Sequence, residues 1–362
     1  MEKKKIAILL PSFEFGGAET MVAQLVNQIN KEKFDVYLIL KKEIKKNALF
    51  DSILDKKIKI FSINNNSKFN VKSIIQMYKL LKNIKPAIIH THLHTYPYVL
   101  LYSFLHRIKI LHTIHNTPSM ESKKIGQRIL KILFKLNIAV PVGISDTITS
   151  QIKDHYKVKN VETIYNPVNI LKFYNVKKVK SSNFTFINVG RMTEQKNQKL
   201  LIKTFSNLLI KYPFCRLIIC GDGALKEELK SLAKDKGIMD KINFTGNVSN
   251  IEDYYSASHV FILSSIYEGL PMTALEAMSS SLPLILTDVG GNKDLIKENG
   301  FLINSNSEEE LYKAMEYMII NEEQRVLFAN NSLSESKKYD IKVITKKYEE
   351  LYIKYEKKNS LK

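Results

Sequence analysis

The chain has 362 residues and 44% of them are hydrophobic, so it is long enough for two domains that each bury a core. This composition excludes a disordered or low-complexity protein. The formal net charge is +19, and residues 1–168 carry most of it, with 27 Lys and Arg against 12 Asp and Glu. Such an excess indicates a polyanionic partner, namely nucleic acid, an anionic lipid surface or a phosphorylated substrate, unless it reflects only a compositional bias toward Lys.

Cysteine content and apolar runs give expectations about location. Cys215 and Cys220 lie in one apolar run at a spacing typical of neither a zinc site nor a disulfide framework, so we expect a reducing, cytoplasmic environment. The apolar run at 6–11 is too short for a signal peptide, and the run at 96–105 is too short to cross a bilayer. We therefore expect a soluble protein or one bound to a membrane surface.

Short apolar runs alternate with helical patterns through the first half of the chain. The expected strands are residues 5–10, 35–40, 58–62, 87–91, 109–114 and 139–144, and helical patterns include 18–30, 70–84 and 123–136. This alternation predicts βαβ units and a parallel sheet with helices on both faces.

The pattern starts again after YNPVN at 165–169 and a Lys-rich bridge at 172–182. A new first strand is expected at 184–190, followed by further strands and helices, and a last helical pattern at 340–357 has no strand after it. We predict an α/β fold of two Rossmann-like, doubly wound parallel-sheet domains facing across a cleft. The domains are 1–168 and 169–339, and 340–362 is a helix that packs back on the N-terminal domain.

Ligands of open α/β sheets bind beyond the carboxyl ends of the strands, so the loops after the strands are the candidate sites. In the first half, Gly16 and Gly17 precede a helix and can let an anion approach its free N–H groups. Histidines gather in HTHLH at 90–94 and HTIHN at 112–116. A metal cluster is one interpretation, but no carboxylate or cysteine lies among them. We expect His90 and His92 to alternate, with one of them in the core, and His115 to be best placed to bond a hydroxyl group.

In the second half, Arg191 and Lys196 follow a strand in GRMTEQKN, where two cations suit a diphosphate. CGDG at 220–223 and FTGNVSN at 244–250 are further turns after strands, each a weak signal alone.

The stretch EGLPMTALEAM at 268–278 holds two acids eight positions apart. Pro271 suits the first turn of a helix, whose N–H groups at Leu270, Met272 and Thr273 are then available to a phosphate. Glu268 precedes the helix and can accept hydrogen bonds from a sugar. Glu276 lies in its second turn, where a buried carboxylate needs a partner such as a ribose diol.

Together these motifs resemble the glycosyltransferases of family 4, which have the GT-B architecture and retain the configuration of the transferred sugar. GGAE, YNPVN, VGRMTEQKN, CGDG, FTGNV and EGLPMTALEAM occur in the order of that family. Two positions depart from its pattern, with Ser281 where the family has glycine and Asp294 where it has glutamate.

The resemblance implies roles by position. Arg191 and Lys196 would bind the donor diphosphate and stabilise the leaving group, Glu268 would contact the donor sugar, and His115 would face it, which makes these four the candidate catalytic residues. Glu276 would hold the ribose, and Gly16 and Gly17 would line the donor phosphates or the acceptor entrance. The remaining donor-binding candidates are Gly221, Asn247, Val248, Gly269, Leu270, Pro271, Met272 and Thr273.

No D-x-D pair is present to hold a metal, so we expect neither a cofactor nor a metal ion, with cations and a helix N-terminus stabilising the developing charge. The expected reaction moves a hexose or N-acetylhexosamine from a nucleoside diphosphate sugar, with UDP as the default, to a sugar or lipid-linked acceptor in bacterial surface polysaccharide synthesis. An epimerase or phosphorylase of the same architecture is the alternative. A non-enzymatic nucleic-acid-binding protein is a remote one, because no recognisable nucleic-acid-binding motif is present.

Residues 123–136 form a basic amphipathic pattern. On a helix, Lys124, Arg128, Lys131 and Lys135 fall in one stripe, and a broad apolar arc lies opposite. The arc is wider than one core contact requires, which is typical of a helix that binds a membrane surface. We expect a cytoplasmic protein that can lie on the inner face of the membrane, although an ordinary packed helix remains the alternative.

Overall fold

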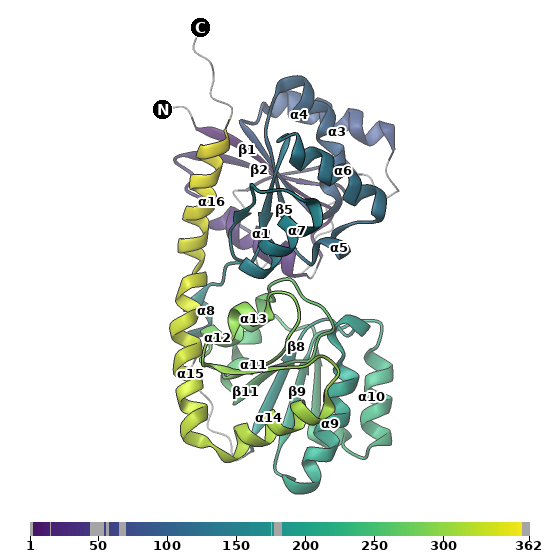
Figure 1. The fold of residues 1–362 in the computed structure, drawn as a ribbon, viewed down its shortest axis with the longest axis vertical. Helices are drawn as coiled ribbons and strands as arrows, with labels where there is room; N and C mark the ends of the chain where they lie inside the picture. Colours follow the sequence, from purple (N-terminus) through teal and green to yellow (C-terminus); the bar gives the residue numbers. More distant parts are fainter. Residues whose placement is uncertain are drawn as a thin grey trace. The chain divides into compact units, whose positions relative to one another are not determined.

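The structure is a computed structural model that describes residues 3–14, 16–43, 54–55, 58–64, 70–174, 176 and 183–356. It divides into two compact units, Met1–Pro167 with Ile341–Lys362, and Val168–Asp340 (Figure 1). Each unit has its own parallel sheet and is described by itself.

The first unit is built on a seven-stranded parallel sheet in the order β3-β2-β1-β4-β5-β6-β7. Its strands are β1 (Lys4–Leu10), β2 (Phe34–Leu40), β3 (Lys59–Ser62), β4 (Ile88–His92), β5 (Ile110–Ile114), β6 (Ala139–Gly143) and β7 (Glu162–Thr163). The direction of winding reverses between β1 and β4. Because ligands bind where the winding reverses, the loops after these two strands are the first candidates for a site in this unit.

Helices cover both faces of this sheet. They are α1 (Gly17–Gln28), α3 (Val71–Ile84), the 3₁₀ helix η1 (Leu93–Tyr98), α4 (Leu100–His106), α5 (Pro118–Glu121), α6 (Lys124–Lys135), α7 (Asp146–Tyr156) and α16 (Ile341–Tyr355). Side-chain caps begin two of them: Asn70 accepts from the N–H of Ser73 in α3, and Ser145 accepts from the N–H of Ile148 in α7.

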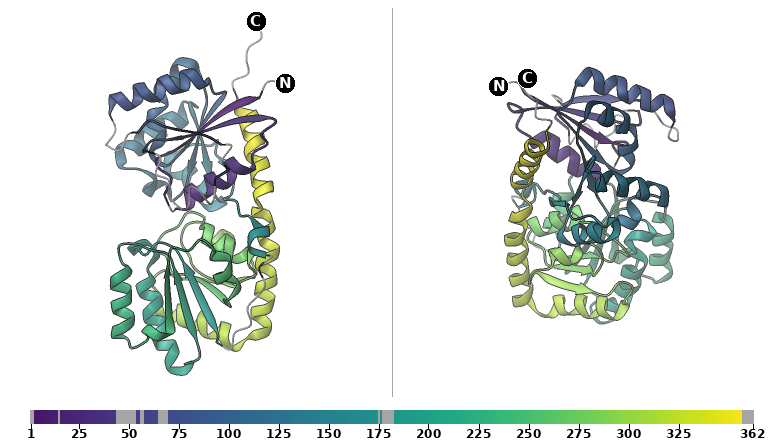
Figure 2. Two further views of the ribbon diagram at one scale, coloured as in Figure 1. Left: turned by 180° about the vertical axis from the view of Figure 1, so that it is seen from behind. Right: turned by 45° about the horizontal axis from the view of Figure 1, so that its top comes forward.

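Helix α16 belongs to this unit although it follows the whole second unit in sequence (Figure 2). It packs against α1, and the ring of Tyr352 meets that of Phe34 on β2 edge-on at 6.2 Å between centroids. Tyr348 and Tyr352 are both fully buried. The core of the first unit is therefore complete only when α16 is in place.

The second unit has a six-stranded parallel sheet in the order β10-β9-β8-β11-β12-β13. Its strands are β8 (Thr185–Val189), β9 (Arg216–Cys220), β10 (Ile242–Gly246), β11 (Val260–Leu263), β12 (Leu284–Thr287) and β13 (Gly300–Ile303). Here the winding reverses between β8 and β11, which are hydrogen-bonded neighbours.

The helices of this unit are α8 (Ile170–Tyr174), η2 (Glu194–Lys196), α9 (Gln198–Lys211), α10 (Lys226–Asp235), η3 (Met239–Lys241), α11 (Ile251–Ser256), α12 (Met272–Ser279), α13 (Asn292–Leu295), α14 (Glu308–Ile320), α15 (Glu322–Ser336) and η4 (Lys337–Tyr339). The core on one side of the sheet joins strands β8 and β9 to helices α9 and α14, through residues such as Phe186, Phe205, Leu217 and Met315.

This architecture confirms the predicted fold class of two doubly wound α/β units. The expected strands are present with ends shifted by one or two residues. Part of the predicted Lys-rich bridge, 175 and 177–182, lies outside the described residues. Within the described ranges, no helix is both long and apolar enough to span a bilayer.

Candidate active site

The strongest candidate site lies where the winding of the second sheet reverses. The loop after β8 carries Lys196 and the loop after β11 carries Glu268, and Lys196 Nζ lies 2.5 Å from Glu268 Oε1. Their side chains are only 15% and 6% exposed. The Ser265 hydroxyl donates to the same carboxylate oxygen over 2.6 Å. Two predicted site residues, 72 positions apart in sequence, are thus joined as a shielded ion pair.

The two loops are held together by hydrogen bonds on both sides of this pair. The Ser264 hydroxyl lies 3.1 Å from the carbonyl oxygen of Lys196, and the N–H of Ile266 donates to the carbonyl of Gln195 over 2.8 Å. In return, the Gln195 side-chain amide donates to the carbonyl of Tyr267 over 3.0 Å. The position of Lys196 relative to Glu268 is therefore fixed by the backbone as well as by charge.

The loop after β12 packs against the backbone of the loop that carries Glu268. Gly290, after β12, has a φ of +54°, and a Cβ placed there would collide with the carbonyl oxygen of Glu268. The N–H of Gly291 donates to the carbonyl of Gly269 over 2.7 Å. Glycine at 290 is thus required both by backbone conformation and by the close approach of the Glu268 loop.

Glycines also pack the loops after β8 and β9. Gly221 has a φ of +128°, and a Cβ there would meet the carbonyl of Gly190, while a Cβ on Gly223 would meet Met192. Gly221 donates its N–H to the carbonyl of Gly246 over 2.8 Å. Close packing therefore requires both glycines of the CGDG turn, Gly221 and Gly223, independently of any role in ligand binding.

Helix α12 begins just beyond Glu268. Pro271 is its N-cap, one position earlier than the first-turn position expected from sequence, and the Pro271 side chain makes no capping hydrogen bond. Gly269, Leu270, Pro271 and Met272 are buried and Thr273 is half-buried. The Thr273 hydroxyl oxygen is enclosed and has no hydrogen-bond partner within the described part of the chain.

Glu276 lies in the second turn of α12, as expected, and is half-buried. The Tyr255 hydroxyl from α11 lies 3.1 Å from Glu276 Oε2 and 3.0 Å from the carbonyl oxygen of Thr273. Loss of hydration raises the pKa of Glu276 to about 7, against the opposing effects of Tyr255 and Lys172. The carboxyl group therefore changes charge near neutral pH.

Three other predicted residues of this unit lie in the loops at the same sheet edge. Arg191 follows β8 with an exposed side chain, and its carbonyl accepts from Gln198 over 3.1 Å. Asn247 is exposed and Val248 half-buried, both in the loop after β10. At the family's glycine position, Ser281 has a φ of +54°, in the left-handed region that favours glycine.

The first unit holds the remaining three predicted residues. Gly16 is the N-cap of α1, Gly17 is its first residue, and no side-chain cap is present. His115 follows β5 and is half-buried. The loops of Gly16 and His115 follow different strands of one parallel sheet and so lie at its same edge.

The other histidines near His115 are buried, which corrects one expectation. His90 and His92 do not divide between core and surface: both are fully buried, because residues two apart on a strand point to the same face. His92 Nδ1 lies 2.8 Å from His115 Nε2, and His90 bonds Thr113 and Tyr352. Burial lowers the pKa of His115 to about 4 and that of His112 to about 3, so both are neutral at pH 7.

Glu121 is a member of this cluster that has no motif to mark it in sequence. It is 4% exposed, and its Oε1 lies 3.6 Å from His112 Nε2. Burial raises its pKa to about 8. Across the described ranges, no group of three His, Cys, Asp or Glu side chains is arranged to hold a metal ion.

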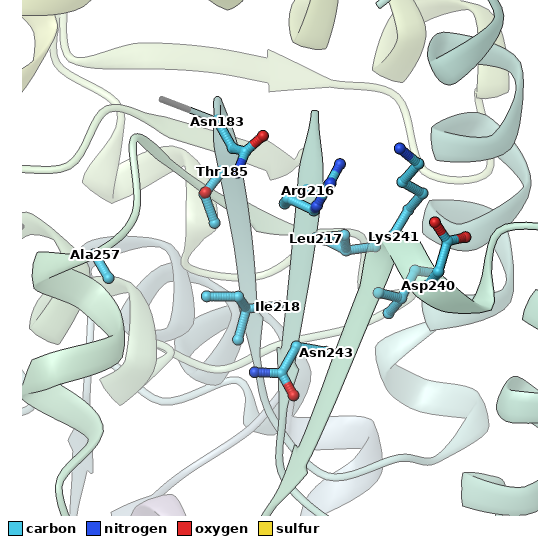
Figure 3. A pocket seen from close by; sticks show the side chains of 10 residues that line it. Asn183, Thr185, Arg216, Leu217, Ile218, Asp240, Lys241, Asn243 and Ala257 are labelled. Carbon is cyan, nitrogen blue, oxygen red and sulfur yellow. The ribbon is translucent and has the colours of Figure 1, made fainter. Parts of the chain in front are cut away.

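A cavity of about 430 Å³ lies elsewhere in the second unit (Figure 3). It is lined by Thr185, Arg216 and Ile218 near the beginnings of β8 and β9, together with Lys241 and Asn243. These are the amino ends of the strands, at the edge opposite the loops of Lys196 and Glu268. The cavity therefore contains none of the predicted site residues.

Comparisons with known proteins agree with this fold. The family pattern described as "Glycosyltransferase Family 4" matches residues 15–171, and "Glycosyl transferases group 1" matches residues 172–334. An uncharacterized glycosyltransferase of Haemophilus influenzae is 30% identical over 356 residues, covering 95% of this chain and 99% of the relative.

Two further similarities are informative. The Escherichia coli UDP-Gal:alpha-D-GlcNAc-diphosphoundecaprenol alpha-1,3-galactosyltransferase is 27% identical, over 83% of this chain and 84% of that one. The crystal structure of Anabaena HepE in complex with UDP and glucose superimposes with a TM-score of 0.81 at 18% identity, covering 96% of this chain and 99% of that one. At that identity the second likeness concerns the fold alone.

Proposed function

The chain belongs to glycosyltransferase family 4, and from this premise we propose that it transfers a hexose or N-acetylhexosamine from a UDP-sugar to a sugar or lipid-linked sugar acceptor in bacterial surface polysaccharide synthesis. The observation that carries the proposal is the shielded pair of Lys196 and Glu268 at the reversal of the second sheet. The relative from Escherichia coli that acts on a diphosphoundecaprenol-linked sugar supports the class of acceptor.

In this proposal, the diphosphate binds where Lys196 and Arg191 meet the N-terminus of α12. Two cations and the positive end of a helix stabilise the negative charge that develops on the leaving diphosphate. Lys196 then moves part of its bonding from Glu268 to a phosphate oxygen. The Glu268 carboxylate, still bonded by Ser265, accepts a hydrogen bond from a hydroxyl of the donor sugar.

Glu276 binds the ribose. A carboxylate in the second turn of α12 is far enough along the helix to accept from the ribose hydroxyls while the diphosphate lies at the helix N-terminus. Tyr255 bonds both Glu276 and the carbonyl of Thr273, so it fixes the carboxylate relative to its own helix. Asn247, Val248 and Gly221, at the neighbouring loops, are assigned to the nucleotide.

The proposed reaction retains the configuration of the sugar and needs no metal ion. The bond from the sugar carbon to the diphosphate oxygen breaks, the acceptor oxygen forms the new bond on the same face, and a leaving phosphate oxygen takes the proton of the acceptor hydroxyl. The α-1,3 linkage that the galactosyltransferase of Escherichia coli forms supports retention. Lys196 and Arg191 supply the charge that a metal ion supplies in other transferases.

A sugar-nucleotide panel tests this function. Purified protein is incubated with UDP-glucose, UDP-galactose and their N-acetylhexosamine counterparts, with and without a polyprenyl diphosphate-linked sugar. We expect acceptor-dependent release of UDP, an α-linked product by NMR, and rates unchanged by EDTA or added Mg²⁺. Interconversion of the free sugar nucleotide without transfer would instead select the epimerase, and loss of activity in EDTA would refute metal independence.

We also propose that the first unit docks on an anionic membrane surface. Only part of the apolar arc of α6 is used in the core: Leu130, Leu133 and Phe134 are buried. The remainder lies outside, with Ile125 73%, Ile132 57% and Leu136 64% exposed. These three residues form one stripe along the helix, beside the stripe of Lys124, Arg128, Lys131 and Lys135.

Helix α4 adds to this surface. Leu101, Phe104 and Leu105 share one side of α4 and are 43%, 73% and 57% exposed. Because β4, β5 and β6 are successive parallel neighbours joined by crossovers of one hand, α4 and α6 cover the same face of the sheet. Exposed apolar side chains flanked by cations fit the boundary of an anionic bilayer, where the apolar groups insert and the cations meet the headgroups.

Vesicle flotation tests the docking surface. Wild type is expected to float with phosphatidylglycerol-containing vesicles and to stay behind with phosphatidylcholine alone. Changing Ile125, Ile132 and Leu136 together to Gln should abolish flotation. The matched control is Ile210→Gln in the second unit, an isoleucine that is 85% exposed and lies outside this surface. Flotation that ignores the triple change, or ignores anionic lipid, would refute the proposal.

A further inference from the structure

One contact in the first unit links the half-buried His115 to a histidine that no ligand can reach. His92, the last residue of β4, is fully buried, and its Nδ1 lies 2.8 Å from His115 Nε2. The two rings lie 5.1 Å apart between centroids. One of these two nitrogens must carry a proton and the other a lone pair, because both rings are neutral at pH 7.

The surroundings of His92 decide which ring donates. Its second nitrogen, Nε2, is enclosed and has no hydrogen-bond partner among the described residues. If His115 donated, the single proton of His92 would have to sit on Nε2, as a buried N–H without an acceptor. If His92 donates from Nδ1, only a lone pair is left unpaired. Buried N–H groups without partners are rarer than acceptors without partners, which favours His92 as the donor.

We propose that His92 is a positioning residue that fixes His115 in the tautomer protonated on Nδ1 and so makes its free nitrogen a hydrogen-bond donor. The inference deepens the proposed function and rests on it, since the family resemblance implies that His115 faces the donor sugar, and the tautomer sets the direction of the hydrogen bond that His115 would make to it. A neutral histidine in water favours the other tautomer, protonated on Nε2. The buried neighbour therefore imposes the less common form.

The remaining contacts of His115 agree with this role. Its ring is held by the contact with His92. In the part of the chain that the structure describes, Nδ1 has no hydrogen-bond partner. A fixed N–H at this atom recognises an acceptor, and under the proposed function that acceptor is a hydroxyl oxygen of the transferred sugar. It cannot serve as the acceptor of a proton from the attacking hydroxyl.

Nitrogen-15 NMR of the ligand-free protein tests the tautomer directly and requires no activity. The expected wild-type spectrum shows His115 protonated on Nδ1. His92→Leu removes the donor and is expected to return His115 to the Nε2 form. His92→Asn places an amide donor near the position of Nδ1 and should preserve the wild-type pattern. His90→Asn is the matched control, because His90 is equally buried but bonds Thr113 and Tyr352 instead of His115.

Kinetics then test the function of this tautomer. His92→Leu is expected to lower kcat by about tenfold to a hundredfold with little change in donor KM, the cost typical of a misplaced site group, and His92→Asn should restore most of it. His92→Leu combined with His115→Ala should be no slower than His115→Ala alone, since both changes remove one interaction.

Two results would overturn the inference. One is a wild-type spectrum with His115 protonated on Nε2. The other is a His92→Leu protein whose spectrum and kcat both equal those of wild type. If His92→Leu fails to fold, the wild-type spectrum and His92→Asn still decide. The expected tautomer in a protein without transferase activity would contradict the proposed function and leave only the tautomer assignment standing.

Discussion

At the scale of single residues, the ion pair of Lys196 and Glu268 decides what substitutions in the site do. Lys196→Ala removes a cation from the proposed diphosphate site and should lower kcat by about 10²–10³-fold, as for loss of a preorganised charge stabiliser. It also leaves the Glu268 carboxylate shielded with Ser265 as its one remaining side-chain partner among the described residues, at a cost of about 3 kcal/mol in the free energy of unfolding. Steady-state transfer assays and urea unfolding measure the two effects.

The control for that change is Lys199→Ala. Lys199 lies three residues further on and pairs with Glu194 and Glu228, both of which are exposed. Exposed pairs contribute little to stability, so both kcat and unfolding should stay near wild type. An equal loss of kcat in the two variants would mean that Lys196 contributes only to the net positive charge of the protein and has no specific place in the site.

Glu276 should make donor binding depend on pH. Its pKa is raised to about 7, so it accepts hydrogen bonds from ribose as a carboxylate above pH 7 and loses that capacity as the pH falls through 7. We expect the donor KM to rise below pH 7. Tyr255→Phe removes a hydroxyl that lowers this pKa, so the transition should move to higher pH. A profile of donor KM from pH 6 to 9 with no shift in this variant would contradict the assignment.

Glu121 predicts a change in stability with pH. Its pKa is about 8 in the folded protein and ordinary when unfolded, so the folded state holds a proton that the unfolded state releases between these values. Stability is therefore fully present at low pH and falls as the pH rises, by about 1 kcal/mol per pH unit. Glu121→Gln should flatten this slope. Urea unfolding of wild type and Glu121→Gln at pH 7 and pH 8 isolates the slope, because the contribution of the buried histidines is the same in both proteins and cancels in the difference.

The sequence predicted the charged residues of the site better than their partners. Lys196, Glu268 and Glu276 stand in recognisable motifs after strands. Ser265, Tyr255 and His92 could not be assigned from sequence, because each acts on a residue of another loop or helix and has no motif of its own. The spacing of His90 and His92 does predict one shared face, and reading it as alternation was the error.

At the scale of elements, the loop after β12 should be as important to the site as the loops that carry charge. Gly290→Ala combines a φ of +54° with a collision against the Glu268 carbonyl, so we expect a loss of at least about 3 kcal/mol in stability and a lowered kcat as the Glu268 loop moves.

The comparison for Gly290 is Gly237→Ala. Gly237 has a similar φ of +67°, but a Cβ there meets nothing within 4 Å. Backbone strain alone should cost about 1–2 kcal/mol and leave kcat unchanged. Thermal unfolding and transfer assays of both variants separate strain from collision. If Gly290→Ala lost no more stability and no more kcat than Gly237→Ala, the close approach of Gly290 to the Glu268 carbonyl would have no effect on function.

Element identity was predictable because the strands are short, apolar and followed by turn residues, as in β1 and β8. The packing partners of α6 were not predictable, because the helical pattern gives a wide apolar arc. The neighbouring α5, α7 and β6 decide which part of that arc is covered. Helix α4 was hidden in the apolar run 96–105, since a short helix and a buried strand have similar composition.

At the scale of the whole molecule, the two units have separate cores, so calorimetry should show which unit each change affects. Tyr352 is fully buried against His90 and Phe34 in the first unit. Tyr352→Ala should lower the unfolding free energy of that unit by about 3–5 kcal/mol, while UDP at a hundred times its Kd should stabilise only the second unit, by about 3 kcal/mol.

Its neighbour supplies the control. Ile353 lies on the same helix and is 46% exposed, so Ile353→Ala should leave both transitions in place. A Tyr352→Ala protein that loses the transition stabilised by UDP would show that α16 is required by the unit that binds the nucleotide.

The assignment of α16 to the first unit also orders events on the ribosome. Residues 341–355 are translated after every residue of the second unit, so a nascent chain can finish the later unit before the earlier one. Until then, the emerged part of the first unit lacks the helix that covers Phe34 and His90. Domains usually fold from the N-terminus during synthesis, but in this chain the first unit cannot complete its core until translation has passed Tyr352.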